Sequence, residues 1–474
     1  MYSSISAFDM IKIGVGPSSS HTMGPWNAAL LFLASLKQKA PLSSVQRVQI
    51  SLYGSLAKTG KGHGTDVATL LGLCGYDFRT IDTQTILPTF EQIKQQRLLT
   101  LAGTIPIVFN YEEDLLFLNK QQLPFHPNGM TIRAFNAEEL LIEKTYFSVG
   151  GGFVVEEHPE ANIKLPIVTP YPCHSAHEIL TNCQQLGWRV SELVKHNETA
   201  WQPHEAVHNQ ALAIWQEIKW CAFRGAYTHG ILPGGLNVKR RAAALNQQLL
   251  GNRTFNNPDE WLDAVQQTSP DFGNVNHWIS CFALAVNEEN AAFGRVVTSP
   301  TNGAAGVMPA VLLYAYCFLK HTSAEKITDF IVTAGEIGTL FKKNATISAA
   351  MGGCQAEIGV SSAMSAAALT DMQGGTPEQV LSAAEIAMEH HLGLTCDPVG
   401  GLVQIPCIER NTMGAMKAIT ASNLALVNQT GDAKVSLDSV IATMWQTALD
   451  MNHKYKETSE AGLAIQISVG LAEC

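Results

Sequence analysis

Apolar and polar residues alternate with different periods in the two halves of the chain. In the first half, the segment "QRVQISLYG" alternates apolar and polar residues, which is typical of a half-buried strand. Short apolar runs recur at "TIPIVF", "MTIRAF" and "TYFSV", bounded by Gly, Asn and Pro. Helix-like stretches lie between them, from Pro25 to about Gln38 and from Asp66 to Leu73. The pattern predicts an α+β domain over residues 1–160.

The second half has a helical pattern throughout. Four prolines between His158 and Pro172 mark a stretch of weak periodicity, and we expect a linker over residues 161–180. From about Ile179 one helix-like stretch follows another, and residues 347–369 are mostly small side chains that let helices pack closely. We therefore predict a larger all-α domain over residues 181–474, following the α+β N-terminal domain.

Composition and charge narrow the class of partner. A chain of 474 residues with 46% hydrophobic residues has enough material for two cores. It needs no structural metal for stability, so any metal would serve chemistry. The formal net charge of -10 argues against nucleic acid or an anionic membrane as the main partner. A small-molecule substrate remains.

No segment predicts export or a membrane span. The opening "MYSSISAFDMIKIG" has Asp9 where a signal peptide would be apolar. The longest uncharged stretch, residues 296–319, contains polar residues and prolines, and its apolar part is too short to cross a bilayer. We expect a cytoplasmic protein, whose ten cysteines are free thiols or metal ligands because that compartment is reducing.

Three cysteines lie in turn-forming contexts: "MGGCQAEIG" at Cys354, "GLTCDPVGG" at Cys396 and "VQIPCIERN" at Cys407. Their spacing, C-x41-C-x10-C, matches neither zinc knuckles nor the close cysteine run of ferredoxins. Spacing alone is equally compatible with three buried thiols. The flanking Gly and Pro favour a ligand role, whereas three other cysteines in plain apolar runs are interpreted as core: Cys221, Cys281 and Cys317. Three thiolates leave one iron of an iron-sulfur cluster open to act as a Lewis acid.

These cysteine contexts belong to a longer series of motifs. With "GPSSSHTMGP", "GKGHGTD", "FSVGGGF", "SPTNGAAGVMPA" and "KYKETSEAGLA", the chain resembles the bacterial iron-sulfur L-serine dehydratases, also called L-serine ammonia-lyases, of the single-chain type with fused β and α domains. The resemblance implies a [4Fe-4S] cluster on Cys354, Cys396 and Cys407, and conversion of L-serine to pyruvate and ammonia in serine catabolism. No lysine context suggests pyridoxal phosphate, so we expect none.

The resemblance implies that a side-chain base removes the serine α-proton while an open iron polarises the C–O bond. A neutral histidine suits this role. His63 is the first candidate for the base and His21 the second, because small residues around both leave room for a ligand. The alternative interpretations are a glycine turn at His63 and a helix N-cap run at His21.

Hydroxyl-rich and glycine-rich segments supply donors for an amino-acid carboxylate. Because the serine-rich loop lies in the other domain from the cysteines, we expect the active site at the junction of the two. Lys454, Lys456 and Thr458 are weaker candidates of the same kind. Cys173 and Ala461 depart from the residues usual in the family. The substrate-binding candidates are Ser18, Ser19, Ser20, Thr22, Lys61, Thr65, Ser148 and Asn302.

The terminal Cys474 is a further candidate ligand. Ten residues separate it from Ala464, the end of the last motif, which is enough to cross a cleft at about 3.3 Å per residue. We hypothesise that its thiolate or carboxylate occupies the fourth iron until serine displaces it. The alternative is a frayed terminus.

Two rival functions remain open at this point. One is an iron-sulfur hydro-lyase that acts on a hydroxy acid, and the other is a non-catalytic iron-sulfur metabolite sensor. For the enzyme, a homodimer is the default assembly.

Overall fold

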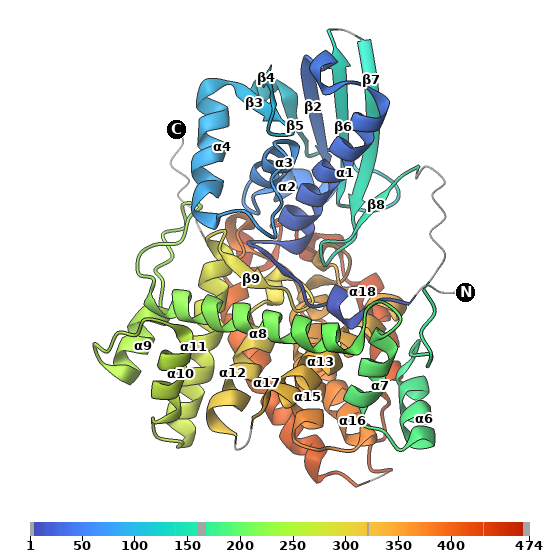
Figure 1. Cartoon of the computed structure of the whole chain (residues 1–474), viewed down its shortest axis with the longest axis vertical. Coiled ribbons are helices and arrows are strands. Elements are labelled where there is room, and N and C mark those ends of the chain that lie inside the picture. Colours follow the sequence, from blue (N-terminus) through green and yellow to red (C-terminus); the bar gives the residue numbers. More distant parts are fainter. Residues whose placement is uncertain (1–3, 138, 159–166, 320–321, 430, 468–474) are drawn as a thin grey trace.

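The computed structural model describes residues 4–137, 139–158, 167–319, 322–429 and 431–467 (Figure 1). A sheet with its helices forms the N-terminal part, and a larger group of helices lies beneath it in the view of Figure 1. The predicted fold class, an α+β domain followed by a larger helical domain, is confirmed. No described helix is both long and apolar enough to cross a bilayer.

The N-terminal sheet has five strands in the order β5-β2-β6-β7-β8. β2 pairs in parallel with β5, and the other neighbours are antiparallel. A separate hairpin pairs β3 with β4. The strands are β2 (Arg47–Tyr53), β3 (Leu98–Leu101), β4 (Ile105–Val108), β5 (Leu115–Leu118), β6 (Gly129–Asn136), β7 (Glu139–Ser148) and β8 (Val154–Glu156). The helices are α1 (Gly24–Lys39), α2 (Gly54–Lys58), α3 (Thr65–Leu73), α4 (Ile86–Gln96) and α5 (Tyr111–Asp114).

The alternation predicted for β2 explains how the sheet buries one face. Val48, Ile50 and Leu52 are fully buried, while Arg47 is exposed. The buried residues join the core that α1 and α3 close, and α1 lies across β6, β7 and β8 (Figure 1). The helices predicted from Pro25 and from Asp66 are α1 and α3, each within two residues at both ends.

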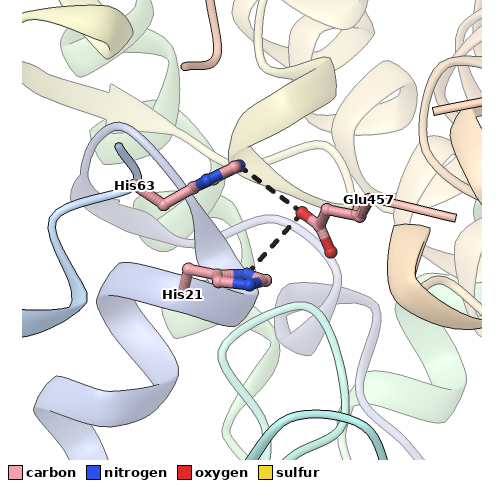
Figure 2. A group of neighbouring side chains, drawn as sticks. All are labelled: His21, His63 and Glu457. Carbon is pink, nitrogen blue, oxygen red and sulfur yellow. Dashed lines mark ion pairs between the residues drawn. The ribbon is translucent and has the colours of Figure 1, made fainter. Parts of the chain in front are cut away.

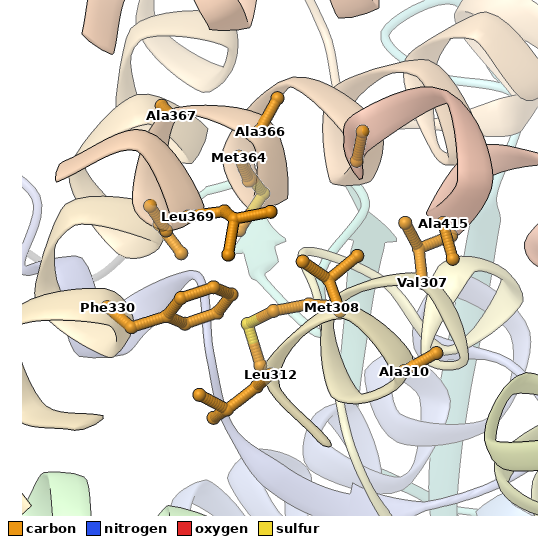
Figure 3. Packing of buried hydrophobic residues seen from close by; sticks show 14 of the residues in the cluster. Val307, Met308, Ala310, Leu312, Phe330, Met364, Ala366, Ala367, Leu369 and Ala415 are labelled. Carbon is orange, nitrogen blue, oxygen red and sulfur yellow. The ribbon is translucent and has the colours of Figure 1, made fainter. Parts of the chain in front are cut away.

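The helical part packs around α15, whose every residue from Ile358 to Met372 is buried. Its small side chains let α13, α16 and α17 approach closely, as the sequence predicts. Figure 3 shows Leu369 of α15 beside Phe330 of α13. The helices are α6 (Ala176–Leu186), α7 (Val190–Glu198), α8 (His204–Tyr227), α9 (Ala242–Leu250), α10 (Pro258–Gln266), α11 (Phe272–Ala291), α12 (Val307–Phe318), α13 (Ala324–Asn344), α14 (Ala349–Gly352), α15, α16 (Pro377–Glu389), α17 (Cys407–Val427) and α18 (Leu437–Asp450).

One short strand in the helical part joins it to the N-terminal part. β1 (Ile13–Val15) pairs antiparallel with β9 (Arg295–Val297), and β9 lies at the junction of the two parts (Figure 1). The all-helical prediction missed β9 because three residues carry too little periodicity to be recognised. This pairing brings the serine-rich segment after β1 against the helical part.

Phe330 allows a direct test of this core. Its side chain is fully buried against Met308 and Leu312 (Figure 3). Phe330→Ala is expected to lower the free energy of unfolding by about 3–5 kcal/mol, because it removes apolar contacts and leaves a cavity. Phe272, which is 79% exposed, provides the matched control, since Phe272→Ala should change that free energy by less than about 0.5 kcal/mol. Equilibrium urea unfolding measures both, and equal effects would contradict this account of the core.

Candidate active site

The serine-rich segment forms a single π-helical turn, Ser19–Met23, that carries His21. The Ser18 side chain accepts a hydrogen bond from the His21 N–H (3.1 Å), and the Ser18 carbonyl accepts bonds from the N–H groups of Thr22 and Met23. The turn continues directly into α1. His21 is fully buried as a result.

The glycine-rich loop between α2 and α3 carries His63. Gly64 has a φ of +66°, a backbone conformation that glycine adopts without strain. A side chain at Gly62 would come 2.4 Å from the Gly401 carbonyl oxygen, so glycine allows this loop to touch the segment after Cys396. Sequence reasoning allowed a plain glycine turn here, but the turn also brings His63 to the junction of the two parts.

Two threonines tie the histidine segments together. The Thr22 hydroxyl donates to the His63 carbonyl, and the Thr65 hydroxyl donates to the His21 carbonyl, both at 2.7 Å. The two imidazole rings consequently lie 4.6 Å apart between centroids. Both threonine hydroxyl protons are therefore engaged in hydrogen bonds between the two histidine segments.

Glu457 reaches the histidines because its segment is hydrogen-bonded to the loop of Cys396. The Cys396 N–H donates to the Tyr455 carbonyl (2.8 Å), and the Glu457 N–H donates to the Cys396 carbonyl (3.0 Å). Glu457 Oε1 lies 3.6 Å from His63 Nε2 and 3.6 Å from His21 Nδ1 (Figure 2). The carboxylate therefore faces both rings.

Hydrogen bonds assign the tautomer of each imidazole. His63 Nδ1 lies 3.0 Å from the Thr59 carbonyl oxygen, which only accepts, so Nδ1 carries the proton and Nε2 a lone pair. His21 Nε2 contacts the hydroxyls of Ser55 (3.1 Å) and Thr59 (3.0 Å). Both hydroxyl protons go to backbone carbonyls, so His21 Nε2 donates to them and Nδ1 keeps the lone pair. Both lone pairs face Glu457.

Burial decides the charges of this group. It lowers the pKa of His63 to about 4. Burial, and then the neighbouring His63, lower the pKa of His21 well below its usual value. Burial and the nearby carboxylate of Glu357 raise the pKa of Glu457 well above its usual value. At neutral pH both imidazoles are therefore uncharged, and His63 is available as a base.

The three predicted cysteine ligands line a single buried cavity. Cys354, Cys396 and Cys407 share it with His63 and Glu457, and all three are free thiols. His21 does not line this cavity, which favours His63 over His21 as the base. The junction of the two parts thus brings cysteines and histidine together, as the sequence predicts.

Arg410 adds positive charge beside the sulfur atoms. Its Nη1 lies 3.3 Å from Cys354 Sγ, and its Nη2 donates to Asp397 Oδ1 (2.8 Å). The hydrogen bond with Cys396 and, after it, the Arg410 charge lower the pKa of the Cys354 thiol. Three converging thiols with a guanidinium donor fit an iron-sulfur cluster, whose charge and sulfur atoms such donors stabilise.

Two carboxylates of the site were missed by sequence reasoning. Glu457 lies inside the motif "KYKETSEAGLA", where only Lys454, Lys456 and Thr458 were candidates. Glu357 lines the same cavity as the cysteines, and burial raises its pKa to about 7. The available signal was an acidic residue inside each motif, but the fold is needed to reveal that both are buried.

The substrate-binding candidates divide by their contacts. Ser18 lines the cavity, and Ser20 Oγ lies 3.0 Å from His21 Nδ1. The Ser19 hydroxyl donates to Asn302 Oδ1 and accepts from the Asn302 N–H, both at 2.7 Å. Ser19 and Asn302 thus bond to each other across the junction.

Two other candidates lie apart from the cavity lining. Lys61 is exposed, with its Nζ 5.3 Å from the centre of the Phe117 ring. Ser148 is buried against Gly24, where an added side chain would meet its Oγ at 2.0 Å. The expected fourth ligand, Cys474, lies outside the described residues.

Comparison with known proteins follows the same two parts. The family model described as serine dehydratase beta chain matches residues 6–159, and the one described as serine dehydratase alpha chain matches residues 185–464. The chain is 47% identical to L-serine dehydratase 1 of Escherichia coli, over 98% of this chain and 99% of that one. It is also 47% identical to the L-serine dehydratase of Streptomyces coelicolor (98% and 99%) and 46% identical to that of Helicobacter pylori (97% and 98%).

Proposed function

The chain belongs to the serine dehydratase family, and on this premise we propose that it is an L-serine ammonia-lyase that converts L-serine to pyruvate and ammonia. One observation carries the proposal at the level of residues. A histidine with a free lone pair, from the N-terminal part, lines the same buried cavity as three thiols from the helical part. This combination supplies a base and a set of soft ligands in one place.

Cys354, Cys396 and Cys407 would hold the [4Fe-4S] cluster. When bound, the cluster supplies a Lewis acid for the departing hydroxyl group. His63 takes the α-proton at Nε2, and the Thr59 carbonyl keeps the imidazole in the required tautomer. Loss of the proton and of hydroxide leaves an enamine, which becomes an imine and is hydrolysed to pyruvate and ammonia.

The neighbouring groups support this role for His63. Glu457 faces the nitrogen that takes the proton, since its Oε1 lies 3.6 Å from His63 Nε2. Ser18 and Ser20 present hydroxyl groups beside the histidines, which suits the substrate carboxylate. Thr22, Thr65, Ser19 and Asn302 hold the segments in position through the contacts described above. Lys61 and Ser148 remain proposed substrate contacts.

Anaerobic purification followed by iron and sulfide analysis and a pyruvate assay on L-serine tests the function. We expect iron, sulfide and ammonia release together, and loss of activity in air as iron is lost. Stoichiometric pyridoxal phosphate without iron would overturn the mechanism. Turnover of malate or citrate without serine turnover would indicate the hydroxy-acid hydro-lyase, and a cluster without any turnover would indicate the sensor.

The pH dependence of turnover provides a prediction for His63. Because its pKa is about 4, the imidazole is neutral across pH 5.5–7.5, so protonation of His63 should not lower kcat/KM for L-serine there. A histidine with the usual pKa of about 6.5 would lose about tenfold between pH 7.5 and 5.5. The measurement is kcat/KM against pH, with cluster absorbance recorded at each point. A tenfold fall at constant absorbance would contradict the prediction.

We also propose that Cys474 occupies the fourth iron of the resting enzyme. Support comes from the tail motif, whose Tyr455 and Glu457 are hydrogen-bonded to Cys396 beside the cavity. Deletion of Cys474 is expected to lower the serine concentration needed for half-maximal rate or to speed oxidative loss of iron. Unchanged values of both would favour a frayed tail.

The assembly and cellular location complete the proposal. We propose a cytoplasmic homodimer, because closed two-fold dimers are the commonest assembly of such enzymes. Light scattering of the anaerobic protein measures the assembly, and a monomeric mass would contradict it.

A further inference from the structure

Three side-chain atoms that can bind a metal ion converge at the junction of the two parts. Glu457 Oε1 lies 3.6 Å from His21 Nδ1 and 3.6 Å from His63 Nε2, and all three atoms lie within 4.8 Å of one another (Figure 2). These separations are longer than a normal hydrogen bond. The side chains of His21, His63 and Glu457 are 0%, 2% and 4% exposed, and His63 and Glu457 line the buried cavity.

Each imidazole is held in place by hydrogen bonds to the nitrogen that does not face Glu457. His63 donates to the Thr59 carbonyl, and His21 donates to the hydroxyls of Ser55 and Thr59. A histidine that binds a metal characteristically donates its second N–H in this manner, which fixes the ring and directs the other lone pair at the ion. The two histidines are therefore already oriented as ligands.

Few hydrogen-bond donors of the protein face Glu457 and the two imidazole nitrogens beside it. Within the described part of the chain, no lysine or arginine pairs with Glu457, and its second oxygen, Oε2, is buried without a hydrogen-bond partner. The Ser20 hydroxyl is the donor nearest His21 Nδ1 (3.0 Å), and it has an alternative acceptor in Ser18 Oγ at 3.3 Å. A cation at the centre would contact all three atoms at once and would displace the proton that the raised pKa of Glu457 favours.

We propose that His21, His63 and Glu457 form a binding site for a divalent transition-metal ion such as Zn²⁺, separate from the three cysteines. Two imidazoles and one carboxylate are a ligand set that Zn²⁺ and Co²⁺ favour. Tetrahedral bonds of about 2.0–2.1 Å hold ligand atoms about 3.3 Å apart, close to the two separations of 3.6 Å. The three ligands leave a fourth position open.

Occupation of this site would also inhibit turnover, and this arm of the inference rests on the proposed function. A metal ion on His63 Nε2 uses the lone pair that the base needs for the α-proton. Zn²⁺ is therefore expected to compete with L-serine, raising the apparent KM about tenfold at ten times its dissociation constant and leaving kcat unchanged. Metal binding itself requires no assumption about the reaction.

A Co²⁺ titration of the anaerobic cluster-loaded enzyme tests the site. The cluster occupies the cysteines, so they do not compete for the added metal. We expect one Co²⁺ per chain, with visible d–d absorption, no thiolate-to-cobalt charge-transfer band, unchanged cluster absorbance, and displacement by Zn²⁺. Glu457→Gln should weaken Co²⁺ binding at least tenfold, because the amide keeps the size of the side chain but cannot become an anionic ligand.

His391 supplies the matched control. It is buried, and its Nδ1 lies 2.7 Å from the Ala387 carbonyl oxygen, the same arrangement as in His63. His391→Asn should leave Co²⁺ affinity unchanged. His21→Gln provides a second test variant if Glu457→Gln does not fold, and circular dichroism checks both.

Equal Co²⁺ affinity in wild type and in a folded Glu457→Gln or His21→Gln variant would overturn the proposal. So would a charge-transfer band or bleaching of the cluster, since either places the added metal on cysteine. Co²⁺ bound through Glu457 without loss of turnover would support the metal site and would instead remove His63 from the role of base.

Discussion

His63→Asn is expected to lower kcat for L-serine by about 10²–10⁴-fold, the usual contribution of a general base. Asparagine retains a donor for the Thr59 carbonyl, so the loop should keep its shape, but it lacks an atom at the position of Nε2. Because the base acts in the transition state, KM should change far less than kcat. Steady-state pyruvate formation on anaerobic enzyme measures both constants, and iron content shows that the cluster is intact.

The control separates loss of the base from loss of structure. His391→Asn removes another buried histidine, also bonded through Nδ1 to a backbone carbonyl, whose pKa burial likewise lowers to about 4. It should retain kcat within about twofold of wild type, because His391 does not line the cavity. Comparable losses of kcat in the two variants would mean that His63 acts through stability rather than chemistry.

The local elements were predictable because short-range patterns determine them. β2 follows from strict alternation and α1 from a periodic run that begins at a proline. The three-residue pairing of β1 with β9 was not predictable, because it joins two segments that lie far apart in the sequence. Patterns within a few residues contain no information about such pairings.

The functional site was also predictable from local patterns but not in its long-range contacts. Residue type and glycine context were enough to select His63 and the three cysteines as candidates. They did not reveal Glu457, whose role depends on backbone hydrogen bonds between its segment and Cys396. Nor did they reveal that Ser19 and Asn302 bond to each other across the junction. Motifs therefore identify which segments meet, while the fold assigns the partner of each polar atom.

The junction also explains why catalytic groups come from both parts. The turn of His21 and the loop of His63 are tied by threonine hydroxyls, and the segment of Glu457 is tied to the cysteine loop. Each part therefore holds its own groups rigidly, and Gly62 lets them meet at close range against Gly401. Preorganisation of this kind keeps the base and the ligands in place before substrate arrives.

Cys354→Ala is expected to remove most of the iron and sulfide and to abolish serine turnover. Cys354 is distinctive among the nine described cysteines because its pKa is lowered, and the Arg410 guanidinium donates to its sulfur at 3.3 Å. The hydrogen bond with Cys396 and, after it, Arg410 lower this pKa, whereas the same hydrogen bond raises the pKa of Cys396 and burial raises that of Cys407. A thiolate is the form that binds iron, so Cys354 should be the ligand that anchors the cluster.

Cys281→Ala is the matched control for this variant. Cys281 is fully buried in α11, and its Sγ donates to the Ala242 carbonyl (3.6 Å), so its loss should affect stability modestly and leave iron unchanged. Iron and sulfide analysis after anaerobic reconstitution, with pyruvate formation, measures both variants. A folded Cys354→Ala protein that retains full iron would exclude Cys354 as a ligand. Equal iron loss in Cys281→Ala would instead trace the effect to the helical core, since Cys281 does not line the cavity.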